Sequence, residues 1–312
     1  MLQYLVDGLV LGSTIGLGAV GLTLTYSILR FANFTHGELL TWGAYLVHGL
    51  LAILTGLLGA DAVQALGRIG PFSFGWPLLV ALVLAMPLTG GIAMLLDSAL
   101  FGRLRGHGAS ITLVIASFGA ALALRNLVVF LWGPTPDYYS RAIQIALPLV
   151  PREVLGGARL TPDQMAVLGL TAVVVVAMHL LLTRTTIGRA MRAVAENPTL
   201  ASVIGIEVRK VIRWTWLIGG GLAALSGVFL GITVQIRPQM GFDLLLPLFS
   251  AAILGGIGSP YGAVLGGLVI GVAESLAVPL VGADYRAAVA FVVLILVLLL
   301  RPQGLLGGRA AG

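Results

Sequence analysis

The sequence predicts an all-α polytopic membrane protein with eight to nine transmembrane helices, some of them broken or re-entrant. Of its 312 residues, 58% are hydrophobic and only 10% are charged, whereas a soluble domain typically carries about 25% charged residues. The basic residues are scattered between long apolar runs, as in membrane proteins, and are not gathered into a patch that would suit nucleic acid. These observations exclude a water-soluble fold and give no indication of a nucleic-acid partner.

Eight apolar runs reach the length of about 20 residues that a transmembrane helix needs. They cover about residues 3–28, 38–58, 76–100, 110–131, 163–183, 211–235, 260–280 and 285–300. A ninth run, about 244–257, is too short to span comfortably and is predicted to be broken or re-entrant. Since no basic residue precedes Arg30, we expect the first run to be a retained span rather than a cleaved signal peptide. The whole chain, 1–312, is predicted to be one transmembrane domain.

The charges of the loops predict the orientation. Eleven basic residues fall on the side of the charged loop 184–213, six fall on the other side, and Arg125 lies within a span. Because cytoplasmic loops are enriched in Lys and Arg, we expect loop 184–213 and the C-terminus to be cytoplasmic and the N-terminus to lie outside. The run 244–257 must then cross, or nearly cross, the membrane. The long external loop 132–162 suits an interfacial cap, and a docking surface for an external protein stays open as the alternative.

A short helix is predicted within the charged loop. The Asn197–Pro198 step is a strong helix start, because Asn accepts the free N–H groups and Pro suits the first helical position, and Gly205 is a typical stop. Two turns of helix are not stable alone in water, so something must hold them. Leu200, Val203 and Ile204 share one face, which either folds back on the chain or docks to a partner.

Two segments interrupt the apolar runs with polar or flexible residues. One follows Arg30, and the other is the glycine-rich stretch around 255–260. Irregular backbone at membrane depth is tolerated only where it is buried or lines a water-filled path, and paired breaks often mark a transporter's pathway. The candidate path residues are Asn33, His36, Gly37 and Glu38 in the first break and Gly255, Gly256, Gly258 and Ser259 in the second. The alternative is an ordinary cytoplasmic turn and a tight loop.

Three ionisable residues lie inside apolar runs, where a charge is costly without a partner. They are Arg125, Glu274 and Asp7. We expect Arg125 to pair with Glu274 or Asp7, either to fix helix packing or to serve as a charge on the substrate path. Glycines also recur at four-residue spacing, which predicts close helix–helix contacts.

Motifs for catalysis are absent from the sequence. There is no phosphate-binding loop with a Gly–Lys pair, no H-E-x-x-H pair, no G-x-S-x-G elbow and no cysteine. The chain is therefore predicted not to be an enzyme and to bind no metal or cofactor itself.

Several separated blocks resemble the LivH-type permeases, the membrane subunits of bacterial ABC importers for branched-chain amino acids. They are GLTLTYSILRFANFTHGELLTWGAY (21–45), GRAMRAVAENPTLASVIGI (188–206), ILGGIGSPYGAVLGGLVIGVAE (253–274) and LLRPQGLLG (299–307). The resemblance implies the ABC importer permease fold and a place in the bacterial cytoplasmic (inner) membrane. It also implies that the short cytoplasmic helix sits in a groove of an ATPase subunit. The residues that would couple to the ATPase are Glu196, Asn197, Pro198, Leu200, Ala201, Val203, Ile204 and Gly205.

The partners that the resemblance implies are a second homologous permease subunit, two ABC ATPase subunits that hold ATP and Mg, and a periplasmic or extracellular substrate-binding protein. The expected substrate is a branched-chain or other hydrophobic amino acid. Related importers carry urea or short amides, so these stay open as alternatives. An ion-coupled secondary transporter that uses Arg125, Glu274 and Asp7 is the alternative from a different class.

Overall fold

The structure is a computed structural model that describes residues 1–59, 69–105, 110–140, 144–151, 157–301 and 303–306. Within these residues, eight helices are long and apolar enough to cross a membrane. They are α1 (Leu2–Leu29), α2 (Thr35–Leu58), α4 (Trp76–Leu96) with its extensions η1 (Asp97–Phe101) and α5 (Gly102–Leu104), α6 (Ser110–Trp132), α7 (Pro162–Arg184), α10 (Val208–Thr233), α12 (Pro260–Val281), and η2 (Ala283–Tyr285) with α13 (Arg286–Leu300). All eight predicted spans are confirmed as helices, so the chain is a multi-pass, all-helical membrane protein.

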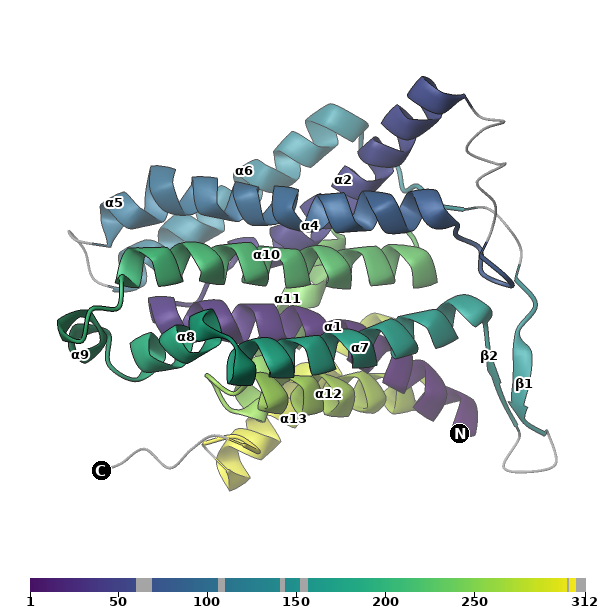
Figure 1. The fold of residues 1–312 in the computed structure, drawn as a ribbon. Coiled ribbons are helices and arrows are strands. Elements are labelled where there is room, and N and C mark those ends of the chain that lie inside the picture. The colour runs from purple at the N-terminus through teal and green to yellow at the C-terminus, as the bar shows by residue number, and fades with distance from the viewer. Residues whose placement is uncertain (60–68, 106–109, 141–143, 152–156, 302, 307–312) are drawn as a thin grey trace.

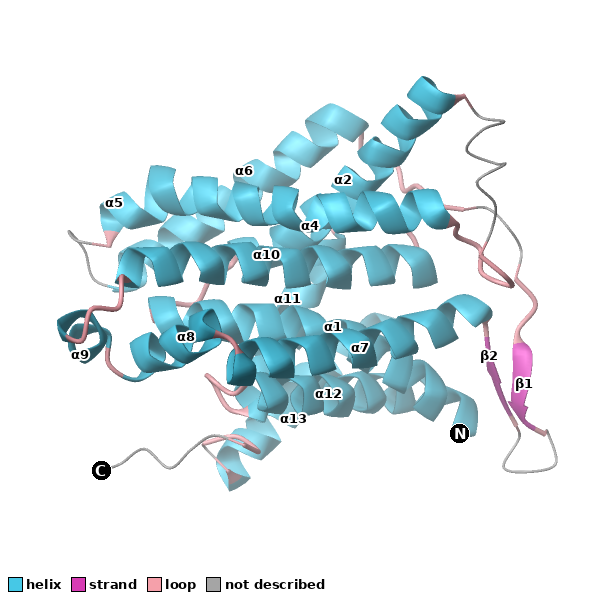
Figure 2. Cartoon of the chain, in the orientation of Figure 1, coloured by secondary structure: helices cyan, strands magenta, loops and turns pink. Residues whose placement is uncertain are grey.

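The remaining elements are short. They are α8 (Thr186–Glu196), α9 (Pro198–Val203), α11 (Met240–Gly255), and an antiparallel hairpin of β1 (Leu147–Val150) and β2 (Ala158–Leu160). Figure 2 shows this hairpin at one end of a molecule that is otherwise helical, with α9 at the opposite end. We call these two ends the hairpin end and the α9 end.

The centre of the bundle is formed by α1 and α10, the two helices with the largest buried share (Figure 1). Small residues let the helices around them approach closely. A Cβ added to Gly12 of α1 would lie 2.8 Å from the carbonyl oxygen of Gly267 in α12, and one added to Gly227 of α10 would lie 2.0 Å from that of Leu40 in α2. The predicted glycine contacts between helices are therefore confirmed at these positions, which pack backbone against backbone.

The helix α2 begins inside the bundle rather than at its edge. Just before it, Oδ1 of Asn33 accepts the Thr35 N–H at 3.1 Å. In its first turn, Nε2 of His36 lies 2.9 Å from the carbonyl oxygen of Gly18 in the middle of α1. The first turns of α2 are buried, whereas Leu57 near its end is 78% exposed. The connection 30–34 therefore runs from the end of α1 to the middle of the bundle. This confirms the predicted break between the first two apolar runs.

The helix α11 is the ninth apolar run, and its 16 residues are shorter than a span. Its first turn packs on the start of α2, since the Gly241 N–H donates to Oγ1 of Thr41 at 3.0 Å and a Cβ on Gly241 would lie 1.9 Å from the Gly37 carbonyl oxygen. The N-terminal ends of α2 and the shorter α11 therefore meet inside the bundle.

The described part of the loop 132–162 is folded against the helix ends. Asp163, at the start of α7, accepts hydrogen bonds from the Ser73 N–H at 2.9 Å and from Nε2 of Gln144 at 2.8 Å. The hydroxyl of Tyr139 donates to the carbonyl oxygen of Ala44 at 2.8 Å, and burial raises the pKa of this hydroxyl. These contacts show that the described part of the loop is folded against the helices; its place at the membrane interface stays a prediction.

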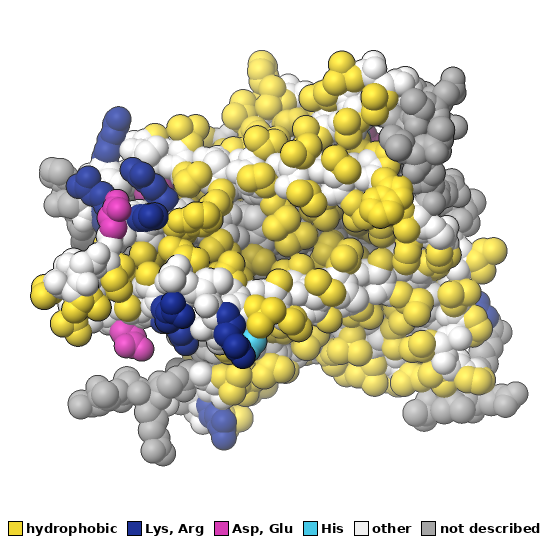
Figure 3. Space-filling model, viewed as in Figure 1, with side chains coloured by type: hydrophobic (Ala, Val, Ile, Leu, Met, Phe, Trp, Pro, Cys, Tyr) yellow, Lys and Arg dark blue, Asp and Glu magenta, His cyan; other side chains and the backbone are white. Residues whose placement is uncertain are grey.

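Charged side chains gather at the α9 end of the molecule. Figure 3 shows lysine and arginine there, while hydrophobic side chains cover the middle of the visible face. This distribution fits a membrane-embedded belt with one basic end.

Candidate functional site

The helices α8 and α9 form a compact unit at the α9 end. The side chain of Asn197 caps α9, because its Oδ1 accepts the N–H of Leu200 at 2.9 Å. At the other end Gly205 has φ +89°, and the N–H groups of Gly205 and Ile206 donate to the carbonyl oxygens of Ser202 and Ala201 at 3.1 and 3.0 Å. This is the hydrogen-bond pattern of a Schellman cap. The predicted start and stop of the short helix are both confirmed.

The apolar face of α9 is exposed. Only Ala201 points inward, at 2% exposure, whereas Leu200, Val203 and Ile204 are 59%, 77% and 67% exposed. The alternative in which this face folds back on the chain's own helices is therefore wrong. The end of α8 carries the exposed Glu196 directly before the cap. Two exposed apolar side chains on α9 and a third on its C-cap residue, Ile204, leave a surface that a partner can cover.

The first break is packed into the protein. Asn33, His36 and Glu38 are at most 1% exposed, and Gly37 lies against the backbone of Gly241. Nδ2 of Asn33 and Nδ1 of His36 have no hydrogen-bond partner within the described residues. The break therefore places polar atoms without protein partners at the middle of the bundle, next to the start of α11.

Arg125 pairs with Glu38, which corrects the prediction of a pair with Glu274 or Asp7. Its Nε and Nη2 donate to Oε1 of Glu38 at 3.1 and 2.8 Å, and its guanidinium carbon lies 4.1 Å from the centre of the Phe242 ring. The reason is the packing order, because α6 lies against α2 and not against α12 or α1.

The two carboxylates expected to pair with Arg125 have other surroundings. Asp7 accepts a hydrogen bond from Nε2 of Gln3 at 2.9 Å at the hairpin end. Glu274 is 3% exposed in α12, and its Oε1 has no partner among the described residues.

The second break is a tight loop between α11 and α12. Gly256 and Gly258 have φ of +99° and +93°, a region that side chains disfavour. Ser259 caps α12, since its Oγ accepts the N–H of Gly262 at 3.1 Å. Gly255 faces Gly262 so closely that a Cβ on it would lie 2.1 Å from the carbonyl oxygen. The positive φ angles and the close backbone contact of this loop already require its glycines, whatever the function of the loop.

A hollow of about 270 Å³ joins this loop to the α8–α9 unit. It is lined by Tyr26, Ser27, Arg30, Ala195, Glu196, Ile257, Gly258 and Ser259. The end of α1, the end of α8 and the α11–α12 loop thus meet around one space at the α9 end. Three segments far apart in the sequence converge there.

The candidate path residues divide into two groups. Gly258 and Ser259 face the hollow, together with Glu196, a residue predicted to couple to the ATPase. Asn33, His36, Gly37 and Glu38 lie deeper, against α1, α6 and α11, and Gly255 and Gly256 are not among the residues that line the hollow. Sequence reasoning missed Arg30 as a lining residue, although it stands directly before the first break.

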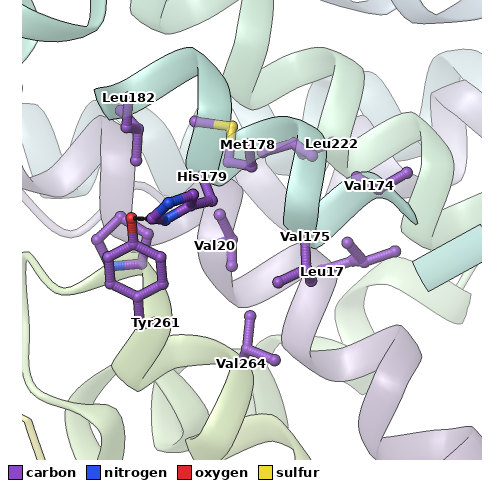
Figure 4. A pocket seen from close by; sticks show the side chains of 11 residues that line it. Leu17, Val20, Val174, Val175, Met178, His179, Leu182, Leu222, Tyr261 and Val264 are labelled. Atoms are coloured by element: carbon purple, nitrogen blue, oxygen red, sulfur yellow. Dashed lines mark hydrogen bonds between the residues drawn. The ribbon is translucent and has the colours of Figure 1, made fainter. Parts of the chain in front are cut away.

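A second, apolar crevice lies between α7, α1 and α12 (Figure 4). Leu17, Val174, Val175 and Met178 are among its walls, and Nδ1 of His179 lies 2.8 Å from the Tyr261 hydroxyl across it. His179 belongs to no group of three or more His, Cys, Asp or Glu side chains that could hold a metal ion, since the part of the chain that the structure describes has none.

Comparison with known proteins gives one family. The family model for the branched-chain amino acid transport system permease component matches residues 4–298. No solved structure matches the chain.

Relatives cover nearly the whole chain. The high-affinity branched-chain amino acid transport system permease protein BraD of Pseudomonas aeruginosa is 35% identical, over 98% of this chain and 95% of its own length. The corresponding protein LivH of Escherichia coli K12 is 34% identical over the same shares. The probable branched-chain amino acid transport permease protein LivH of Methanocaldococcus jannaschii is 26% identical, over 93% of this chain and 87% of its own. With its eight apolar helices and these matches, the chain belongs to the family of permease components of branched-chain amino acid transport systems.

Proposed function

We propose that this chain is the membrane subunit of an ATP-driven importer for branched-chain or other hydrophobic amino acids. The family supports the role of a permease component, and the names of BraD and LivH support the substrate class. The exposed apolar face of α9 is the single structural observation that carries the ATP-driven part. A permease without an ATP site needs a surface by which a separate ATPase can drive it.

Docking of an ATPase would use the segment from Glu196 to Gly205. Leu200, Val203 and Ile204 would enter an apolar groove of the ATPase, while Ala201 holds α9 to its own protein. Asn197 and Gly205 fix both ends of the helix, so the docking face is preorganised and little ordering entropy is lost on binding. ATP and Mg would be bound by the two ATPase subunits.

The rest of the proposed assembly follows the family. A second, homologous permease would complete the membrane part, and an external binding protein would deliver the amino acid at the hairpin end. This assigns the N-terminus to the outside and the α9 end to the cytoplasm, in agreement with the basic side chains at the α9 end. Access would alternate between the two sides as the ATPases close and open.

The secondary-transporter alternative has less support. It would use Arg125, Glu274 and Asp7, but Arg125 is neutralised by Glu38 and Asp7 lies at the hairpin end beside Gln3. Of the three, this leaves Glu274 alone as a buried carboxylate whose Oε1 has no partner among the described residues.

Uptake into proteoliposomes tests the proposal. The complex purified from native membranes, with its binding protein added, is expected to accumulate radiolabelled leucine only when ATP is enclosed with the ATPases. Urea and acetamide serve as competitor substrates. Uptake of urea instead of leucine would change the substrate class, and uptake driven by an ion gradient without ATP would overturn the ATP-driven mechanism.

A further inference from the structure

Arg30 stands at the end of α1 in an unusual backbone conformation. Its φ is +58° and its ψ is 31°, and among the described residues it is the one non-glycine with positive φ. This region is unfavourable for any residue with a Cβ. The residue must therefore be held there by its contacts, and its N–H donates to the carbonyl oxygen of Tyr26 at 2.8 Å.

The guanidinium of Arg30 reaches the coupling segment. Its Nη2 donates to the carbonyl oxygen of Ala195, in the last turn of α8. The last four carbonyls of a helix have no partner within the helix, and a cation at this end is favourable. Ala195 is followed by Glu196 and by the α9 cap Asn197. One side chain thus joins the end of α1 to the base of α9, across 165 positions of sequence.

On its other side Arg30 begins the connection to α2. Phe31 is 2% exposed and its ring centre lies 5.3 Å from that of Phe101, while the Phe34 N–H donates to Oγ of Ser117 at 3.1 Å. Thr35 then starts α2 in the middle of the bundle. The connection 31–34 is only four residues long and leads directly into α2, so a displacement of Arg30 is passed on to the start of α2 when these two contacts move with it.

The hollow beside Arg30 provides space for such a displacement. Protein interiors are close-packed and transmit strain without yielding, but here about 270 Å³ separate Arg30 and Ala195 from the loop at Gly258. The Arg30–Ala195 contact lies at the border of this space. The α8–α9 unit can therefore shift relative to the α11–α12 loop without a collision.

We propose that Arg30 is the positioning residue through which α9 controls the α1–α2 connection. Movement of a docked α9 carries the Ala195 carbonyl, the Arg30 guanidinium follows it, and the segment 31–34 moves the start of α2, where Asn33, His36 and Glu38 lie. The proposal rests on the proposed function, because it assumes that an ATPase moves α9. Loss of the guanidinium leaves α9 intact, so docking and ATP hydrolysis continue while transport falls.

Three substitutions separate the backbone role from the guanidinium role. Arg30→Asn and Arg30→Gly tolerate positive φ and therefore preserve the fold, but neither reaches Ala195. Arg30→Lys keeps a donor and a charge without the planar fork. Arg301→Gln is the matched control, since it removes an arginine at the α9 end whose side chain has no hydrogen bond or ion pair within the described residues.

The experiment uses the full importer in proteoliposomes and measures ATPase recovery, ATP hydrolysis and amino-acid uptake together. Arg30→Asn and Arg30→Gly are expected to retain ATPase recovery and to lower uptake per ATP hydrolysed about tenfold, with partial recovery in Arg30→Lys. As a second readout, nucleotide is expected to change maleimide labelling of Ser27→Cys, in the wall of the hollow, and this change is lost with Arg30→Asn.

The outcomes distinguish a failure of the proposed function from a failure of the proposed role of Arg30. If the unmodified complex lacks ATP-driven uptake, the proposed function fails, whatever Arg30 does. If that complex transports and Arg30→Asn and Arg30→Gly keep the same uptake per ATP as Arg301→Gln, the role of Arg30 is wrong. Loss of ATPase recovery in both variants would also contradict it, by making Arg30 a part of the docking structure.

Discussion

At the scale of single residues, the ion pair between Glu38 and Arg125 is a charged contact inside the bundle. Glu38 is fully buried and the Arg125 side chain is 18% exposed. Within a membrane, a buried charge that loses its partner is strongly destabilising. The pair therefore joins α2 to α6 next to the buried start of α2. Its loss should lower the stability of the protein itself, whatever its effect on the binding of a partner subunit.

Glu38→Gln is expected to destabilise the protein by roughly 2–3 kcal/mol, because it leaves Arg125 charged without its counterion. The double substitution Glu38→Gln with Arg125→Gln should recover part of this loss. Thermal unfolding in detergent, arranged as a double-mutant cycle, measures both. Effects of Glu38→Gln and Arg125→Gln that simply add up to the effect of the double substitution would show that the pair contributes nothing.

Gly241 gives a second prediction at this scale. Gly241→Ala should destabilise the contact of α11 with α2 by about 1–3 kcal/mol, since the new Cβ would lie 1.9 Å from the Gly37 carbonyl oxygen. Gly119→Ala in α6 is the control, because a Cβ there meets nothing within 4 Å. Equal unfolding temperatures for the two variants would contradict the close contact.

At the scale of elements, the residues that hold α9 to the protein differ from the exposed residues that a partner would cover. Val203→Asp changes a side chain that is 77% exposed, so it should leave the unfolding temperature unchanged. Because it places a charge in an apolar contact, it should reduce recovery of the ATPase several-fold. Thr186→Asp, also exposed but at the start of α8 and outside the segment from Glu196 to Gly205, is the control for added charge. Unchanged ATPase recovery with Val203→Asp would remove α9 from the docking surface.

Gly205→Val tests the stop of the same helix. A β-branched residue at φ +89° is strained, so α9 should be disturbed while membrane insertion stays intact. ATPase recovery and the amount of protein in the membrane are the two quantities to compare. If the Gly205→Val variant recovers as much ATPase as the unmodified chain, Gly205 is not needed to hold α9 in its docking conformation.

The sequence predicted the elements far better than the contacts between them. Apolar runs and the Asn197 and Gly205 signals are local, and both the spans and the short helix follow from them. The predicted partner of Arg125 was wrong, because the depth of a residue in the membrane does not indicate which helix lies beside it. The Arg30–Ala195 contact joins the blocks at 21–45 and 188–206, and no spacing within one block indicates it.

At the scale of the whole molecule, the basic end and the hairpin end should lie on opposite sides of the membrane. The chain has no cysteine, so single cysteines report their own position. Ile145→Cys, at 83% exposure near the hairpin, should react with an impermeant maleimide in intact cells, and Val203→Cys only after permeabilisation. The reverse labelling would invert the proposed orientation.

The central claim is that this permease is driven by separate ATPases that dock on α9. Affinity purification of the tagged chain from native membranes, followed by identification of the bound proteins, tests it most directly. The account predicts recovery of two ATPase chains and a second, homologous permease, with the ATPases lost in the Val203→Asp variant. A lone or homo-oligomeric chain that still transports along an ion gradient would contradict it.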